Sequence, residues 1–593
     1  MSIFKKKENV KESIVLTRIF VSAVFILHFI YFAFYNKYHL AYQEQIQLFR
    51  YDCEYFKEFL LKPGGISEYA GTFLMQFYLF PTIGAFIVTF LAIALFFLSK
   101  NILKKSNINS LLWHLIPVLF VTILQSDYVF YASYTIGFLI SLSFYIIYLQ
   151  LNNNYIRIIF FIFSIIFVYV IAGEFVILTI TLILFYEFFN TQNKFMFLLV
   201  FISVALIISA HFILKNPLYL LPPDYLWLKP LIIYGNTFTR VSMLIMLAYF
   251  PVLLLLGKIW QLMFKGRQVQ ILMNLRLFIT GLLIIISCSF LIFFYVYDYK
   301  TELLLGIDNN IQKEKWENVL KISAKAPGLN QLAVYLTNIA LYKSGKLGDE
   351  MFHYNQIGTQ GLFPGWGGEA SPFFGNEVLY HLGYINEAHR WAFEAMVSKG
   401  QVPRLLKRLA ITSIINGNYE TARKFLNVLK KTLFYRKWAL HYINLISNPD
   451  KTYEDEEIRE KRHFLINSDF FANVNDYEGE LIKLLENHPD NRMAFEYLMS
   501  SYLLRKDLLN FARNIYRLKE LNYKEIPVHY EEALLMSGLT KLIPEGYSIR
   551  ESTLQTFNNY IITYSTYTGT PDKLQEILFS RFGKTYFYYY QFR

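Results

Sequence analysis

Long runs of apolar residues dominate the first half of the chain and limit what it can fold into. Between about Ile14 and Tyr297, stretches of Leu, Ile, Phe and Val recur with few charges inside them. A helix needs about 20 apolar residues to cross roughly 30 Å of hydrocarbon, and several of these stretches reach that length. After Asp298 the composition becomes charged and ordinary. We therefore expect a membrane domain, residues 1–298, followed by a second domain, residues 299–593.

The order of the apolar runs and of the basic residues between them predicts a topology. Lysines before the first run and after the second, such as Lys5 and Lys104, place both ends in the cytoplasm, so the loop 37–76 faces outward. As one helix, the run 156–189 would be about 50 Å long and too long for a single crossing. Ala172-Gly173-Glu174 interrupts it, and we interpret it as two short spans. The nine expected spans are 14–35, 77–98, 111–124, 130–149, two within 156–189, 195–214, 241–264 and 277–296.

Nine spans place residues 299–593 outside the membrane. If 156–189 crossed only once, this domain would be cytoplasmic, and basic residues such as Lys265 and Arg276 would lie outside, against the positive-inside bias. The first run lacks a small-residue cleavage site and is interpreted as an uncleaved span. The two cysteines lie in a loop and in an apolar run, and no Cys or His group has metal-ligand spacing, so we predict no metal site and leave the cofactor unknown.

The second domain contains an internal similarity typical of helical repeats. The hexapeptide Gly383–Ala388 (GYINEA) precedes Gly417–Ala422 (GNYETA) by 34 residues. This pattern resembles tetratricopeptide repeats, in which a small residue ends the turn and the alanine packs one helix on the other. Such repeats stack into a superhelix with a concave binding face. We predict an all-α fold, a polytopic helical membrane domain followed by an α-solenoid; an irregular helical domain is the alternative.

Two aromatic segments stand out in the second domain. Residues 363–375 contain two prolines and four glycines, which argues against a helix through them. They form either a long loop or a lid on the membrane face, with Trp366 and Phe373 as amphipathic anchors. The C-terminal run Tyr586–Tyr590 either packs on the repeats or lies in the headgroup layer, where Tyr is favoured.

The loop 37–76 carries the residues best suited to chemistry. Its stretch from Asp52 to Leu60 has an apolar and a charged face, so it can form an amphipathic helix in the membrane interface. Asp52 and Glu54 stand at its start. A carboxylate just outside the bilayer can deprotonate an acceptor hydroxyl or bind a divalent cation, and we predict these two as catalytic residues. Equally, acids at a helix start favour the macrodipole.

Four further residues are predicted to bind substrate. Asp127 and Glu174 are acids at the outer ends of spans, and ionisable groups at membrane depth are costly and often functional. Arg240 begins a span and can meet a lipid phosphate, or it can be a snorkelling end residue. Trp366 belongs to the possible lid. The structural alternative for the two acids is a turn position in the headgroup layer.

The loop and its acids resemble the membrane glycosyltransferases that use lipid-linked sugars. These proteins have many spans, a large first outer loop with interfacial helices, and an acidic catalytic residue in that loop. The protein mannosyltransferases among them carry an adjacent acidic pair, whereas here Cys53 separates Asp52 from Glu54. In layout the chain also resembles an uncharacterised bacterial family of multispan proteins with C-terminal helical repeats, which implies the bacterial inner membrane as its location.

Two functions follow as hypotheses. The first is an extracytoplasmic glycosyltransferase that uses a polyprenyl-phosphate-linked sugar, with membrane lipid and a lipid-linked sugar as partners. The second is a non-enzymatic membrane scaffold whose repeats recruit a protein partner in envelope assembly. The net charge of +12 does not indicate nucleic-acid binding, because the basic residues lie in short loops between apolar runs.

Overall fold

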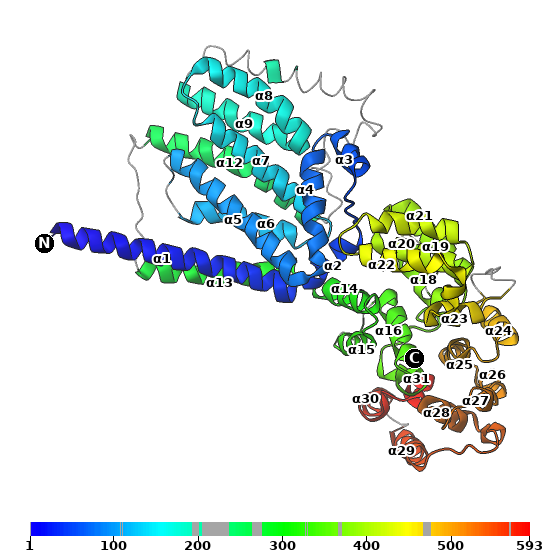
Figure 1. The fold of residues 1–593 in the computed structure, drawn as a ribbon. Helices are drawn as coiled ribbons and strands as arrows, with labels where there is room; N and C mark the ends of the chain where they lie inside the picture. The colour runs from blue at the N-terminus through cyan, green and yellow to red at the C-terminus, as the bar shows by residue number, and fades with distance from the viewer. Residues whose placement is uncertain are drawn as a thin grey trace. The chain divides into compact units, whose positions relative to one another are not determined.

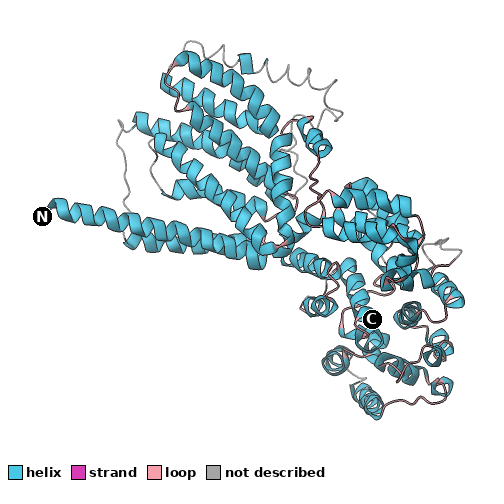
Figure 2. Ribbon diagram, in the orientation of Figure 1, coloured by secondary structure: helices cyan, strands magenta, loops and turns pink. Residues whose placement is uncertain are grey.

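The protein is described here by a computed structural model (Figure 1). It describes residues 2–106, 108, 111–191, 201–203, 205, 237–263, 275–325, 328, 330–363, 365, 370–466, 476–567 and 571–593. The chain divides into two compact units, Met1–Asp298 and Tyr299–Arg593, and each is described by itself. Figure 2 shows that the regular elements of the described residues are helices, with no strand among them. The all-α prediction is confirmed for this part of the chain.

The first unit contains the long apolar helices and the helices of the loop between the first two of them. In chain order its elements are α1 (Ser2–Ile30), η1 (Tyr31–Tyr35), α2 (Lys37–Gln45), α3 (Cys53–Leu60), α4 (Gly65–Met75), η2 (Gln76–Leu79), α5 (Pro81–Lys105), α6 (Leu111–Gln125), α7 (Ala132–Tyr148), α8 (Asn154–Ala172), η3 (Gly173–Phe175), α9 (Val176–Tyr186), η4 (Glu187–Thr191), α12 (Thr237–Met263) and α13 (Leu275–Val296).

Four described stretches are long and apolar enough to cross a membrane, and they indicate a multi-pass membrane protein. They are Ile14–Tyr35, Pro81–Lys105, Asn154–Phe189 and Thr239–Ile259. The expected count of nine spans is therefore wrong for the described residues. Helices α6 and α7, two of the expected spans, are shorter apolar helices. The expected span 195–214 lies largely outside the described residues.

The stretch Asn154–Phe189 turns back on itself at Gly173. Arg157 near its start and Glu187 near its end form an ion pair, with 3.7 Å between Nη1 and Oε1. In one straight helix these residues would lie about 45 Å apart. Gly173 has a φ of +64°, a conformation that glycine adopts without the steric cost of a Cβ. Helices α8 and α9 thus form a hairpin, with the turn at the sequence interruption.

Helix α7 lies at the centre of the first unit, and α4, α5, α8 and α9 pack against it. Its buried residues Phe138 and Leu142 join Phe175 and Phe250, from η3 and α12, in one apolar core. The Ser141 hydroxyl donates to the backbone oxygen of Phe175 at 3.0 Å. A hydroxyl that bonds a backbone carbonyl lets two helices approach closely where no water is at hand.

The second unit is a series of helices, many of them joined by short turns. Its elements are α14 (Tyr299–Ile311), α15 (Trp316–Ser323), α16 (Gln331–Lys343), α17 (Leu347–Glu350), η5 (Met351–His353), α18 (Ala370–Leu382), α19 (Ile385–Lys399), α20 (Pro403–Ile415), α21 (Tyr419–Lys430), α22 (Arg436–Ile446), η6 (Pro449–Tyr453), α23 (Glu456–His463), α24 (Tyr477–Asn487), α25 (Arg492–Arg505), α26 (Leu508–Arg513), α27 (Arg517–Glu520), α28 (Val528–Ser537), η7 (Thr540–Leu542), α29 (Glu551–Tyr567), α30 (Pro571–Phe582) and α31 (Tyr586–Phe592). From α18 to α22, each helix packs against the next along the chain.

The two matching hexapeptides form the same turn. Gly383 and Gly417 both have positive φ, +105° and +75°. In each turn the following residue donates its N–H to the carbonyl five positions earlier, at 2.9 and 2.8 Å. Ala388 and Ala422 are fully buried where the paired helices meet. This local part of the expectation is confirmed, but the described residues do not identify a repeat domain, because the Gly-to-Ala register is not kept beyond these two hairpins.

Both aromatic segments of the second unit, 363–375 and Tyr586–Tyr590, contain buried residues. Helix α18 begins at Ala370, so the expected absence of a helix through 363–375 is wrong at its end; Pro372 falls in the first turn, where proline is tolerated. Phe373 is buried, and Trp366 lies outside the described residues. At the C-terminus, the backbone N–H of Tyr586 donates to Glu532 at 2.7 Å, and Phe587 is fully buried. The C-terminal run therefore packs within the second unit.

Candidate functional site

Asp52 is the N-cap of α3. Its Oδ1 accepts a hydrogen bond from the backbone N–H of Tyr55 at 3.0 Å, as a capping carboxylate does. Its Oδ2 lies 3.8 Å from Nε of Arg50. The carboxylate thus has a structural role, which the sequence left as an alternative to catalysis. Glu54, in the first turn of the same helix, is exposed.

The apolar face of α3 is divided between packing and exposure. Tyr55 and Phe59 are buried in a cluster with Phe49, against which Tyr69 of α4 also packs. Phe56 and Leu60, expected on the same face, are 38% and 43% exposed. An exposed pair of large apolar side chains beside a buried one is what a helix at a membrane interface presents.

Two close backbone contacts dock the loop on the helices. The N–H of Gly64 points at the last carbonyls of α8, 3.2 Å from the Tyr169 oxygen and 3.1 Å from that of Val170. A Cβ on Gly64 would lie 3.1 Å from the backbone nitrogen of Gly173. One on Gly71 would lie 2.6 Å from the backbone of Ser133 in α7. The loop 37–76 is therefore a folded part of the first unit and lies against the α8–α9 turn.

Asp127 joins the α6–α7 turn to the start of α12. Its Oδ2 accepts a hydrogen bond from the Thr239 hydroxyl at 2.6 Å, and its Oδ1 accepts from the backbone N–H of Val129 at 3.2 Å. Both carboxylate oxygens thus hold the fold together. Arg240, the next residue of α12, is exposed.

Glu174 lines an apolar groove between α9 and α12. The cavity has a volume of about 310 Å³. Its lining is apolar apart from Glu174 and a threonine, and comprises Glu174, Phe175, Ile177, Leu178, Thr181, Leu244, Leu247, Ala248 and Pro251. Two lining residues, Ile177 and Leu244, are about half exposed. The groove is therefore open along its apolar side, with a carboxylate at the turn end of α9.

A charged pair lies on the loop segment next to that end of the groove. Glu68 of α4 forms an ion pair with Lys62, with 2.8 Å between Oε1 and Nζ. The Glu68 N–H donates to the Gly64 oxygen at 3.1 Å, and Gly64 packs on Gly173, the residue before Glu174. The structure thus puts Glu174 and Glu68, a residue that the sequence did not single out, on neighbouring segments, and Asp52 does not line the groove.

One buried ionic site in the first unit was missed from the sequence. Glu187 is 1% exposed and accepts a hydrogen bond from the Tyr148 hydroxyl at 2.7 Å. Arg157 lies beside it and donates to the Tyr186 hydroxyl at 3.2 Å. The sequence does contain a signal for this site: two residues of opposite charge stand at the ends of an apolar run that has a glycine at its middle. A hairpin that turns at the glycine brings these two charges together.

A second buried network holds α14, α18 and α20 together. Arg404 donates to Asp308 at 2.8 Å, and Arg408 pairs with Glu377 at 2.5 Å. Burial by itself raises the pKa of Glu377, but the Arg408 and Arg404 guanidiniums outweigh it and hold that pKa below its usual range. Burial raises the pKa of Asp308, although Arg404 opposes this effect. Arg404 also lies over the ring of Phe373, 4.8 Å from its centroid.

Fold and groove together define a helical membrane protein with a folded polar loop and a second helical unit. The chain belongs to a family described as "Family of unknown function (DUF6057)", whose model matches residues 12–593. No curated protein and no solved structure matches the chain.

Proposed function

We propose that this membrane protein binds a lipid in the groove between α9 and α12, and that it is an extracytoplasmic glycosyltransferase using a polyprenyl-phosphate-linked sugar. The observation that carries the proposal is the groove itself. Its lining is apolar, it opens beside exposed side chains such as Leu244, and it ends at one carboxylate, Glu174. A hydrocarbon chain suits the apolar lining, and a reactive head group needs a polar residue at the end.

The reaction assigns a role to two residues. Glu174 accepts the proton of an acceptor hydroxyl, whose oxygen then bonds to the anomeric carbon of the sugar. The bond from that carbon to the phosphate oxygen breaks, and its electron pair leaves with the polyprenyl phosphate. Arg240 precedes Leu244 by four residues, so both lie on one face of α12, and its guanidinium suits a phosphate. Because Asp52 caps α3, we place the base at Glu174.

We further propose an orientation in the membrane. The N-terminus is cytoplasmic, and the loop 37–76 and residues 299–593 face the outside of a bacterial inner membrane. Its support is the excess of lysines before the first apolar run and after the second. The loop packs against the turn end of the α8–α9 hairpin, so Glu174 in that turn lies beside the loop, which supports an outward-facing site.

The test uses a pair of tryptophan variants on α12. Ala248→Trp fills the groove, whereas Ile245→Trp introduces the same side chain at an exposed position that does not line it. Binding of polyprenyl phosphate to the detergent-solubilised protein is measured by native mass spectrometry. We expect A248W to lose binding and I245W to retain it. Equal binding by both variants would contradict the groove as the lipid site.

Transfer is measured separately, with a radiolabelled polyprenyl-phosphate sugar and isolated cell envelopes as acceptor. We expect Glu174→Gln to keep lipid binding and lose transfer, because the amide cannot take the proton. Loss of transfer in Asp52→Asn alone would instead place the base in the loop. Binding without transfer in the wild type would remove the enzymatic proposal and leave a lipid-binding protein.

A second candidate, a scaffold that recruits a protein partner in envelope assembly, is favoured by one surface feature. Phe393 and Val397, one turn apart on α19, are 46% and 74% exposed. Neighbouring large apolar side chains on a surface mark interaction sites. If the protein is a scaffold, an envelope protein should co-purify with both the wild type and the Glu174→Gln variant. The double variant Phe393→Ser/Val397→Ser should lose this partner. If the same protein still co-purifies, the scaffold surface is not α19.

A further inference from the structure

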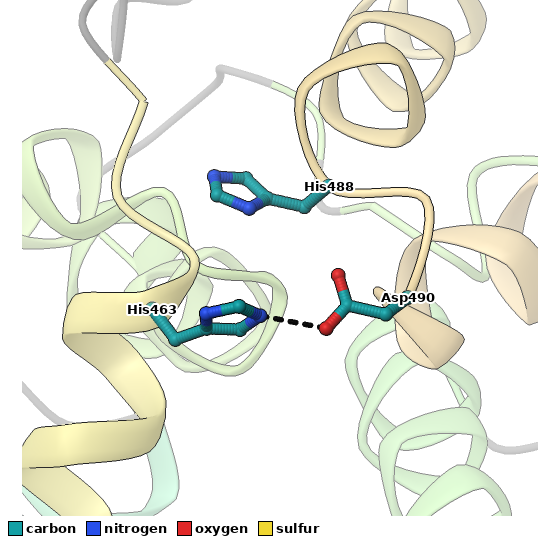
Figure 3. Close-up of side chains that lie close together, drawn as sticks. All are labelled: His463, His488 and Asp490. Carbon is teal, nitrogen blue, oxygen red and sulfur yellow. Dashed lines mark hydrogen bonds and ion pairs between the residues drawn. The ribbon is translucent and has the colours of Figure 1, made fainter.

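Three metal-ligating side chains from two neighbouring segments of the second unit point toward one another (Figure 3). His463 is the last residue of α23, and His488 and Asp490 lie between α24 and α25. One ligand atom from each lies within 4.8 Å of the other two. Nε2 of His463 is 2.6 Å from Oδ2 of Asp490. We infer that these three residues form a binding site for a divalent transition-metal ion, with zinc the best match.

The hydrogen bond that His488 makes leaves its other nitrogen available to a metal. Nε2 of His488 lies 3.1 Å from the backbone oxygen of Leu465. A carbonyl can only accept, so Nε2 carries the proton and Nδ1 keeps its lone pair. A metal-binding histidine commonly donates its other ring N–H to a backbone carbonyl, which fixes its tautomer and orientation. His488 has this arrangement before any metal binds.

The backbone on both sides of the site is held in place. Asn491 caps α25, and its side-chain amide donates to the backbone oxygen of Leu382 at 2.8 Å in a buried position. Its backbone N–H donates to the His488 oxygen at 3.0 Å. On the other segment, a Cβ on Gly383 would lie 2.8 Å from the Cβ of Phe464, so the residue after His463 packs closely on the α18–α19 turn. The backbone positions of the ligands are therefore set by the fold.

The donor set favours zinc. Imidazole nitrogen and carboxylate oxygen are common zinc ligands, and three protein ligands leave one position of a tetrahedron for water. Tetrahedral bonds of about 2.0–2.1 Å place donors roughly 3.4 Å apart, so Nε2 of His463 and Oδ2 of Asp490, which are 2.6 Å apart, must separate slightly, and pairs that lie farther apart, within 4.8 Å, must draw together. The side chains of His463 and Asp490 are more than half exposed and can rotate. Hard cations such as calcium and magnesium prefer oxygen ligands and fit this set poorly.

The bound ion would clip the end of α23 to the loop between α24 and α25. No sequence pattern indicated this site, because His488 comes 25 positions after His463 and zinc motifs are recognised by short spacings. Potential metal ligands that lack a short sequence spacing can therefore still lie close together in the folded chain. The inference is independent of the proposed lipid site, which lies in the other unit.

The test uses the full-length, tag-free protein in detergent after removal of metal with a chelator. Zinc chloride is titrated by calorimetry, and bound zinc is counted by elemental analysis. We expect one zinc per chain, with affinity falling in His463→Ala and Asp490→Asn by more than the roughly 10–100-fold that loss of an outer-sphere partner costs. His441→Ala, which removes an exposed histidine elsewhere in the unit, is the control and should bind as the wild type does.

Cobalt supplies a second readout that does not depend on activity. Co²⁺ in place of Zn²⁺ should give the intense visible absorption of a tetrahedral site in the wild type and none in His463→Ala. His463 is exposed, so this variant should fold even if His488→Ala, which loses the bond to Leu465, does not. The inference is overturned if the wild type takes up no zinc, or if H463A binds it as tightly as the wild type does.

Discussion

Gly64 and Gly173 meet backbone to backbone, and neither position has room for a side chain. Both have positive φ, +70° and +64°, and each lies within 3.4 Å of the position that a Cβ on the other would occupy. Few sequence signals distinguish such a pair from ordinary turn glycines, because the partner of each is far along the chain. The sequence marked Gly173 as an interruption, and its contact with Gly64 was visible only in the folded chain.

Replacing Gly64 with alanine should destabilise the first unit. The variant must adopt a left-handed conformation and also displace the backbone at Gly173, at a cost of about 1–3 kcal/mol for the strained residue alone. Thermal unfolding in detergent measures the loss. Gly257→Ala is the control, because its Cβ meets only the side chain of Ile108. Equal melting temperatures for the two variants would contradict the close approach.

Glu377 should make the second unit sensitive to acid. Its pKa is lower in the folded chain than in the unfolded chain, so its contribution is fully present above the usual value of 4.5 and is lost as pH falls through the folded pKa. Glu377→Gln leaves Arg404 and Arg408 without their shared carboxylate. Removing one partner of a buried ion pair costs about 3–5 kcal/mol. We expect that loss at neutral pH.

Denaturant unfolding at pH 7 and at about pH 3 checks this prediction. The difference between the unfolding free energies of E377Q and the wild type should narrow at the lower pH, since protonation of Glu377 in the wild type then competes with its ion pairs. Comparing the two proteins at each pH removes the opposite effect of Asp308, whose pKa is raised. Glu420→Gln, at a side chain that is 86% exposed, is the control. A difference that is the same at both pH values would mean that the pKa of Glu377 is not lowered in the folded chain.

Among the elements, the α8–α9 hairpin shows what sequence patterns can predict and what they cannot. The run was too long for one crossing and was broken at its centre, which predicted the turn at Gly173. The pattern could not show that the hairpin is short or that the loop 37–76 covers its turn. The position of the loop depends on side-chain volumes at close contacts, such as the one between Gly71 and Ser133. For the same reason, Asp52 was recognised as a helix start but not excluded from a cleft.

The ion pair at the open end of this hairpin should couple its two helices. Arg157→Met and Glu187→Leu each leave an unpaired buried charge and should lower stability by about 3–5 kcal/mol. The double variant removes both charges and should recover most of the loss. A double-mutant cycle of thermal unfolding measures the coupling. Additive losses in the double variant would mean that the two helices do not lie side by side in the membrane.

At the scale of the whole molecule, composition predicted where the chain divides into two units, but it did not predict the number of membrane spans. The boundary between the two units lies between Asp298 and Tyr299, where the apolar runs end. Counting apolar stretches gave nine spans because helices such as α6 and α7 are as apolar as longer ones. Their buried faces serve packing inside the unit, as Val121 and Leu142 show, and composition does not separate packing from lipid contact.

Residues 299–593 should fold without the first unit. They have their own buried core. It includes the ionic network of Arg404 and Arg408 with Asp308 and Glu377, and the aromatic cluster around Phe587. Expressed alone, this segment should be helical by circular dichroism, should unfold cooperatively, and should resist proteolysis without detergent. An unfolded or aggregated segment would show that the first unit is needed for its stability.

The contact of Gly64 with the end of α8 also sets an order of events during synthesis. The loop leaves the ribosome early, but the carbonyls of Tyr169 and Val170 that its Gly64 N–H approaches are made much later. Until then the loop has no surface on which to settle, and the last turn of α8 has no cover for its backbone. A nascent chain halted before Tyr169 should therefore expose the loop to added protease, and release of the halt should protect it.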